Sequence, residues 1–196
     1  MTSAQARRTG VTGQMMDKLA RRGLLRRVRH GVYTLELGPH YRDETLASAW
    51  LAVDPKPFPW ERAAQPPLAV VSHASAASLR GLGTIIPTLP DLTQTTQGSR
   101  RDEIRFHIAP LHPADWNWLD ANGLRLPVTT PARTIVDLLL DHEETDYLTR
   151  ALHQTYESAT TARDDLTAAA ERRKHHHGRL VAATRALIRD AFGAYA

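Results

Sequence analysis

The chain has 196 residues, of which 42% are hydrophobic and 23% are charged, as is ordinary for a soluble globular protein. It contains no cysteine, which excludes disulfides and zinc–thiolate sites. No apolar run approaches the roughly 18 residues that a membrane helix needs, and no secretory signal follows Met1, so we expect a cytoplasmic protein without a membrane partner.

The positive charge is concentrated at one end of the chain. Residues 1–40 hold eight of the 25 lysines and arginines but only two of the 21 aspartates and glutamates, so this segment is net +6 and the whole chain is +4. A charge concentrated in this way is typical of a surface that binds a polyanion. The alternative is a solvated basic surface that contacts another protein.

The cationic segment begins with signals for two short helices. Thr2 and Gln5 form a capping-box pattern, and Gly10 is placed to end the helix that they begin. Thr12 is placed to cap a second helix, which we expect to end before Gly23. The two helices are separated by a tight turn.

A hairpin is predicted next, with strands at 24–28 and 32–35 around a turn that contains Gly31. The order helix, turn, helix, hairpin predicts a winged helix-turn-helix domain over 1–38. Such a domain packs three helices, and its first helix is absent from this pattern. The missing helix is supplied by a longer true start, by another part of the chain, or by a partner.

In the DNA-binding interpretation, the second helix is the recognition helix. Gln14, Lys18 and Arg21 recur at helical spacing on one face, and these residue types pair with adenine and guanine edges in a major groove. Phosphate contacts are expected from the arginines of the hairpin, which position the protein without reading sequence. These are Arg26, Arg27 and Arg29.

The rest of the chain, 42–196, predicts a mixed α/β domain that follows a break at Gly38-Pro39, so the expected fold class is α+β. Strands are predicted within 68–71, 89–96, 104–108 and 124–128. Helices are predicted after the caps Asp43, Ser72 and Thr130 and over the tail 144–193, whereas 54–67, with five prolines, predicts an irregular loop.

No catalytic group, metal site or cofactor is predicted. Ser72 and His73 invite a nucleophile–base interpretation, but adjacent residues at a helix start usually point apart and no G-x-S-x-G elbow surrounds them, so a capping role for Ser72 is favoured. His107 and His112 flank a strand exit and either meet a ligand or pack as ordinary side chains. The two glycine-rich phosphate-binding motifs, G-x-x-x-x-G-K-[ST] and G-x-G-x-x-G, are both absent from the sequence.

Two further clusters are interpreted as surface features. The carboxylates Asp141, Glu143, Glu144 and Asp146 suit a helix boundary and lack the spacing of a metal-dependent nuclease. The three consecutive histidines at 175–177 lie in a basic stretch before a glycine and predict an exposed turn, where nickel or zinc binding is adventitious.

Three blocks, in order and spacing, resemble the AbiEi-type antitoxins of bacterial toxin–antitoxin operons. The first runs from 4–11 to Gly31-Val32-Tyr33, the second covers 69–77 with Leu79 and 81–83, and the third covers 126–134 before Val136-Asp137-Leu138. The resemblance spans nearly the whole chain. No single block is specific to the family, whereas the three blocks in this order are.

This resemblance implies a winged helix that binds inverted repeats in its own promoter and represses the operon, with 42–196 as the AbiEi-like antitoxin domain and 144–193 as its terminal helices. It also implies neutralisation of a cognate AbiEii-type nucleotidyltransferase toxin. Gln14, Lys18, Arg21 and Arg22 then fall in the recognition helix. We expect a non-enzymatic protein that acts as a pair on DNA.

Two other functions stay open. One is a protein-interaction module that binds the toxin through the tail helices without binding DNA. The other is a nucleic-acid-processing enzyme, supported only by scattered histidines and carboxylates. A related group with the same front half continues into a restriction-endonuclease-like domain that this chain is expected to lack.

Overall fold

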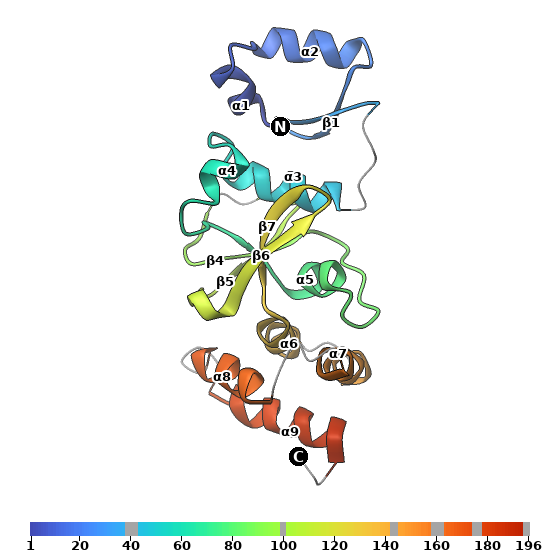
Figure 1. The fold of residues 1–196 in the computed structure, drawn as a ribbon, viewed down its shortest axis with the longest axis vertical. Helices are drawn as coiled ribbons and strands as arrows, with labels where there is room; N and C mark the ends of the chain where they lie inside the picture. The colour runs from blue at the N-terminus through green and yellow to red at the C-terminus, as the bar shows by residue number, and fades with distance from the viewer. Residues whose placement is uncertain (38–42, 99–100, 142–144, 158–162, 174–177, 194–196) are drawn as a thin grey trace. The chain divides into compact units, whose positions relative to one another are not determined.

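The computed structural model describes the chain except for residues 38–42, 99–100, 142–144, 158–162, 174–177 and 194–196 (Figure 1). It confirms the α+β class, with a two-stranded and a five-stranded sheet and helices at both ends. Contacts divide the chain into two compact units, 1–69 with 119–126 and 70–118 with 127–196. The first unit extends beyond the boundary expected near 38. The independence of 1–38 as a domain stays a prediction.

The first unit begins with the two predicted helices, α1 (Ser3–Arg8) and α2 (Gly13–Arg21). Thr2 caps α1 by accepting a hydrogen bond from the Gln5 backbone N–H, and the Gln5 side chain returns to the Thr2 N–H at 2.9 Å. Thr12 caps α2 by accepting from the Met15 N–H. Both caps satisfy N–H groups that a helix start leaves unpaired, which is why these short helices begin where the sequence predicts.

The predicted hairpin follows as β1 (Leu25–Arg29) and β2 (Val32–Leu35), paired antiparallel (Figure 1). Gly31 in the turn has φ +72°, a conformation that favours glycine. The register shifts between Arg27 and Arg29, so the alternation of side chains is broken there. This irregularity decides which hairpin arginines face solvent.

The helices and the hairpin share a small core of Ala6, Met16 and Tyr33. A third helix, α3 (Glu44–Val53), also packs against β1 and β2 within this unit. Another part of the chain therefore supplies a helix that packs against the hairpin.

The segment 54–67, expected to be irregular, contains a short helix, α4 (Pro59–Arg62), so that expectation is wrong in part. Pro59 occupies the first turn, where its missing N–H costs nothing. The Glu61 carboxylate accepts a hydrogen bond from the Phe58 N–H at 2.7 Å and closes the helix start.

The second unit is built on a sheet in the order β5-β4-β3-β7-β6. Its strands are β3 (Val70–Val71), β4 (Asp91–Gln94), β5 (Arg105–Ile108), β6 (Trp116–Ala121) and β7 (Leu124–Thr129), with the β6–β7 turn counted in the first unit. β3 runs antiparallel to β4 and parallel to β7, and β4 runs parallel to β5. The predicted strands are confirmed, but β6 was missed.

Helices complete the second unit: α5 (His73–Arg80), α6 (Pro131–Leu140), α7 (Thr145–Glu157), α8 (Arg163–Arg173) and α9 (Leu180–Phe192). Figure 1 shows α6 to α9 grouped together, and their buried residues form one apolar cluster that includes Ile135, Leu148, Leu152, Leu166 and Leu187. Over the described residues, every helix is too short or too polar to cross a lipid bilayer.

Candidate nucleic-acid interface

The exposed face of α2 carries the predicted base-reading residues. Gln14, Lys18 and Arg21 are exposed, and so is Arg22 at the end of the helix, whereas Met16 is buried in the core of the first unit. The helix is therefore amphipathic in the sense that the sequence predicts. Its polar side is available to a ligand.

The cations of this face have no acidic partner among the described residues. Lys18, Arg21 and Arg22 form no ion pair there, nor does the exposed Arg7 of α1, whereas Arg8 is paired with Glu61. Exposed guanidinium and ammonium groups without an acidic partner are available to attract an external anion. This set of four is called the α2 cationic face below.

Two hairpin arginines do not lie where the sequence predicts. Arg29 is only 9% exposed and its Nε lies 3.5 Å from the Ser48 Oγ of α3. Arg26 is half-buried and its Nη2 bonds the Glu44 carboxylate at 2.6 Å. The packing of α3 against the hairpin accompanies the burial of Arg29 and the pairing of Arg26 with Glu44, so neither arginine belongs to the phosphate-contacting set.

Arg27 is the hairpin arginine that remains exposed. Its Nη2 lies 2.6 Å from His30 Nδ1 at the hairpin turn. This contact holds the Arg27 guanidinium beside the turn of the hairpin.

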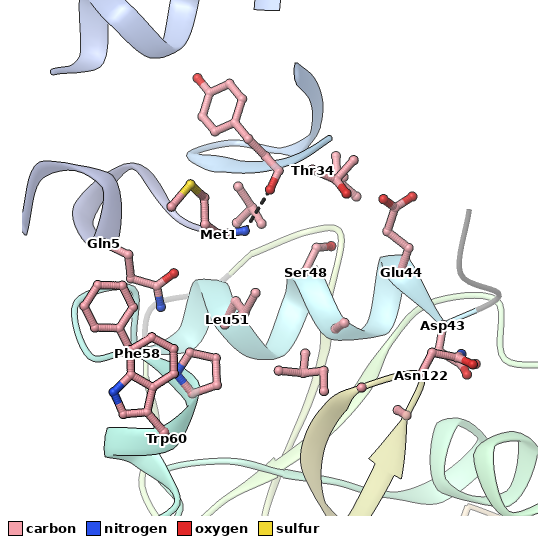
Figure 2. A pocket seen from close by; sticks show the side chains of 18 residues that line it. Met1, Gln5, Thr34, Asp43, Glu44, Ser48, Leu51, Phe58, Trp60 and Asn122 are labelled. Carbon is pink, nitrogen blue, oxygen red and sulfur yellow. Dashed lines mark hydrogen bonds between the residues drawn. The ribbon is translucent and has the colours of Figure 1, made fainter. Parts of the chain in front are cut away.

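A mostly apolar pocket of about 410 Å³ lies between the hairpin and α3 in the first unit. Figure 2 shows Glu44, Ser48 and Leu51 on the side of α3 toward the hairpin, with Phe58 and Trp60 at one end. The Phe58 and Trp60 rings stack with centroids 4.5 Å apart. Sequence reasoning did not find this pocket, because its walls come from segments that no motif links.

The Ser72–His73 pair is closer than its sequence position predicts. Ser72 Oγ lies 2.9 Å from His73 Nδ1, so the expectation that the two side chains point apart is wrong. The reason is backbone geometry, since His73 has φ +49° at the first position of α5. The expected capping role of the Ser72 side chain is also wrong, since the fully buried hydroxyl makes no capping bond.

The structure divides the other candidate histidines and carboxylates, since the ligating atoms of His107 and Asp141 lie within 4.8 Å of that of His73. His107 contacts Asp91, whereas the exposed His112 accepts a bond from the Ala114 N–H and caps a 3-10 turn at Pro113–Asp115. Asp141 follows α6 and Asp146 lies in the first turn of α7. Glu143, Glu144 and the histidines at 175–177 lie outside the described residues.

Comparison with known proteins places the fold but no function. No protein-family model and no curated protein matches the chain. Among solved structures it is similar to the RV2827C protein from Mycobacterium tuberculosis, with 17% sequence identity and a TM-score of 0.56 over 89% of this chain and 68% of that one. A likeness at this identity concerns the fold alone.

Proposed function

We propose that the chain is an antitoxin that represses its own operon by binding promoter DNA and neutralises a cognate nucleotidyltransferase toxin. The observation that carries DNA binding is the α2 cationic face, which is exposed, unpaired and followed by a hairpin. The α2 side chains at recognition-helix positions are Gln14, Lys18 and Arg21, and these can contact base edges as well as phosphates.

The proposed contact set is smaller than the sequence predicts. It contains Gln14, Lys18, Arg21 and Arg22 from α2 and Arg27 from the hairpin, and Arg7 joins them from α1. Each phosphate contact releases condensed counterions, so the affinity for DNA falls steeply with salt. A basic surface that is only exposed to water and does not bind DNA shows no salt-dependent affinity for a duplex.

The test reverses charge on the α2 cationic face. The double variant Lys18→Glu, Arg21→Glu is expected to abolish retardation of promoter DNA in a gel. The matched control is Arg179→Glu, Arg185→Glu, which makes the same change of net charge at exposed positions of the second unit. Equal loss in both variants, or retained binding in the first, contradicts the proposal.

Recognition of inverted repeats needs two recognition helices, and one chain supplies one α2. We therefore expect two copies on an operator, with half-sites separated by about one turn of duplex. A footprint that covers a single half-site argues against this arrangement.

Toxin neutralisation is supported by the three sequence blocks that resemble AbiEi-type antitoxins. Co-expression of the chain with the nucleotidyltransferase of its own operon is expected to restore growth that the toxin alone arrests. The double variant Lys18→Glu, Arg21→Glu is expected to retain this rescue, because repression and neutralisation are assigned to different parts of the chain.

One observation favours a second function, a toxin-binding module without DNA affinity. The burial of Arg29 and the pairing of Arg26 with Glu44 leave the hairpin with fewer available cations than a phosphate-binding wing was expected to have. Co-purification with the toxin, together with no retardation of promoter DNA at low salt, selects this alternative.

A further inference from the structure

Three side chains of metal-ligating type meet in the second unit. His73 begins α5, His107 lies on β5, and Asp141 follows the end of α6. One ligating atom of each residue lies within 4.8 Å of those of the other two. The topology of the sheet brings them together, because β5 lies beside β4 and β4 pairs with β3, the strand that leads into His73.

One nitrogen of each imidazole contacts a neighbouring oxygen. His73 Nδ1 lies 2.9 Å from Ser72 Oγ, which also accepts a hydrogen bond from Thr93 Oγ1 at 2.7 Å. His107 Nε2 lies 3.1 Å from Asp91 Oδ1. Histidines that bind metals donate their second ring N–H to such a carboxylate or oxygen, which fixes the tautomer and the ring direction.

The ligating atoms of the three residues lie close together. In the tautomer that donates Nδ1–H to Ser72 Oγ, His73 keeps a lone pair on Nε2, which lies 4.0 Å from Asp141 Oδ2. In the tautomer that donates Nε2–H to Asp91, His107 keeps its lone pair on Nδ1. Two imidazole nitrogens and a carboxylate oxygen form the donor set of three-ligand zinc sites, in which water takes the fourth position.

The charged groups around the three side chains have partners of their own, since Arg105 Nη1 lies 3.5 Å from Asp91 Oδ1 and Arg133 Nε lies 2.9 Å from Asp137 Oδ1.

The site is strained and has an opening. His73 has φ +49°, and its ring stacks on that of His107 with centroids 3.4 Å apart. A left-handed non-glycine residue costs free energy and is kept where the surrounding structure fixes it, often at functional positions. The side chain of His73 is only 3% exposed, but that of Asp141 is 34% exposed and provides the entry path.

We propose that His73, His107 and Asp141 bind a divalent transition-metal ion of the zinc type. The two stacked rings tilt apart as their lone pairs converge on the ion, and Asp141 supplies the anionic ligand from the open side. Magnesium and calcium prefer sites made of oxygen donors alone, so the two imidazoles select against them. This assignment is independent of DNA binding.

The test uses the full chain and Zn²⁺ as the probe. We expect the histidines at 175–177 to bind such ions adventitiously, so the background variant carries His175→Gln, His176→Gln and His177→Gln. After removal of metal by a chelator, calorimetric titration is expected to give one equivalent of Zn²⁺ per chain, with a rise in Tm. Co²⁺ in its place is expected to give the intense visible bands of four-coordinate cobalt.

The matched pair in this background is His107→Gln and His112→Gln. We expect His107→Gln to weaken Zn²⁺ binding at least 100-fold, because it removes a ligand, and His112→Gln to leave it unchanged. Equal affinity in the two variants overturns the proposal, and so does a background variant that binds no Zn²⁺.

A further variant keeps the test decisive if circular dichroism shows that His107→Gln does not fold. Asp141→Asn changes a partly exposed side chain at the end of α6 and is expected to weaken Zn²⁺ binding at least tenfold while the fold is retained. Unchanged affinity in this variant also overturns the proposal.

Discussion

Arg133 and Asp137 form an ion pair in which neither side chain is exposed, with Arg133 Nε 2.9 Å from Asp137 Oδ1 one turn further along α6. The same guanidinium bonds Asp115 Oδ2 at 2.8 Å and the Pro110 carbonyl oxygen at 3.2 Å. One cation thus ties α6 to the segment between β5 and β6. Because burial removes water from all of these groups, each depends on its partners.

We expect Arg133→Met to destabilise the protein by about 3–5 kcal/mol, since it deprives two buried carboxylates of a partner. Urea unfolding followed by circular dichroism measures the loss. Arg185→Met, at an exposed position of α9, is the control and is expected to change stability by less than about 0.5 kcal/mol. Similar values for the two variants contradict the role assigned to Arg133.

A second prediction about stability concerns the turn between β6 and β7. Asn122 and Gly123 have φ +55° and +84°, the pair of left-handed conformations of a tight hairpin turn. Nothing lies within 4 Å of a Cβ added to Gly123, so Gly123→Ala costs only the backbone strain, about 1–2 kcal/mol. Thermal unfolding at fixed pH measures it.

Gly13 is the matched control for this substitution. It also has open space around an added Cβ, but it lies in the first turn of α2 without a positive φ. Gly13→Ala is therefore expected to stabilise the protein by about 0.4–1 kcal/mol. A loss of stability at Gly13 as large as that at Gly123 shows that strain is not the cause.

Local signals predict much of this fold because they depend on neighbours in sequence. The side chains of the caps Thr2, Thr12 and Thr130 each accept a hydrogen bond from the backbone N–H three residues further along the chain. These helix starts can therefore be predicted without tertiary contacts. The Asn122-Gly123 pair was a usable signal for β6, since this dipeptide is typical of a two-residue hairpin turn.

Tertiary packing sets the features that the sequence did not predict. The direction of Arg29 depends on a register shift in β1 and on Ser48 of α3, and neither is visible in local patterns. The stacking of His73 on His107 depends on the order of strands in a sheet. A motif search finds neither, because the partners are far apart in the sequence and no spacing links them.

The buried His73 makes stability depend on pH. Burial lowers its folded-state pKa below the ordinary value of 6.5, so the folded chain binds fewer protons than the unfolded chain. The contribution of the neutral His73 imidazole to the free energy of unfolding is fully present above pH 6.5. It is lost as the pH falls from 6.5 through the folded-state pKa. With a chelator present, the urea concentration at the midpoint of unfolding is expected to fall as the pH is lowered from 8 to 5.

His73→Asn isolates this contribution, because asparagine tolerates the left-handed backbone but does not titrate. The groups that act on the imidazole, His107, Asp91, Asp137 and Asp141, remain in the variant. We expect a smaller fall in stability between pH 8 and pH 5 than in the original chain. An identical pH profile in the two proteins assigns the dependence to other groups.

The salt dependence of DNA binding separates the outward cations from the inward ones. Lys18→Gln removes a cation of the α2 cationic face, so the slope of log Kobs against log salt is expected to become shallower by about 0.9. Arg29→Gln removes a buried cation that bonds α3, so it is expected to lower stability and leave the slope unchanged. Fluorescence anisotropy with labelled promoter DNA at several salt concentrations measures both slopes. A shallower slope for Arg29→Gln places that guanidinium on the phosphate backbone and contradicts its inward orientation.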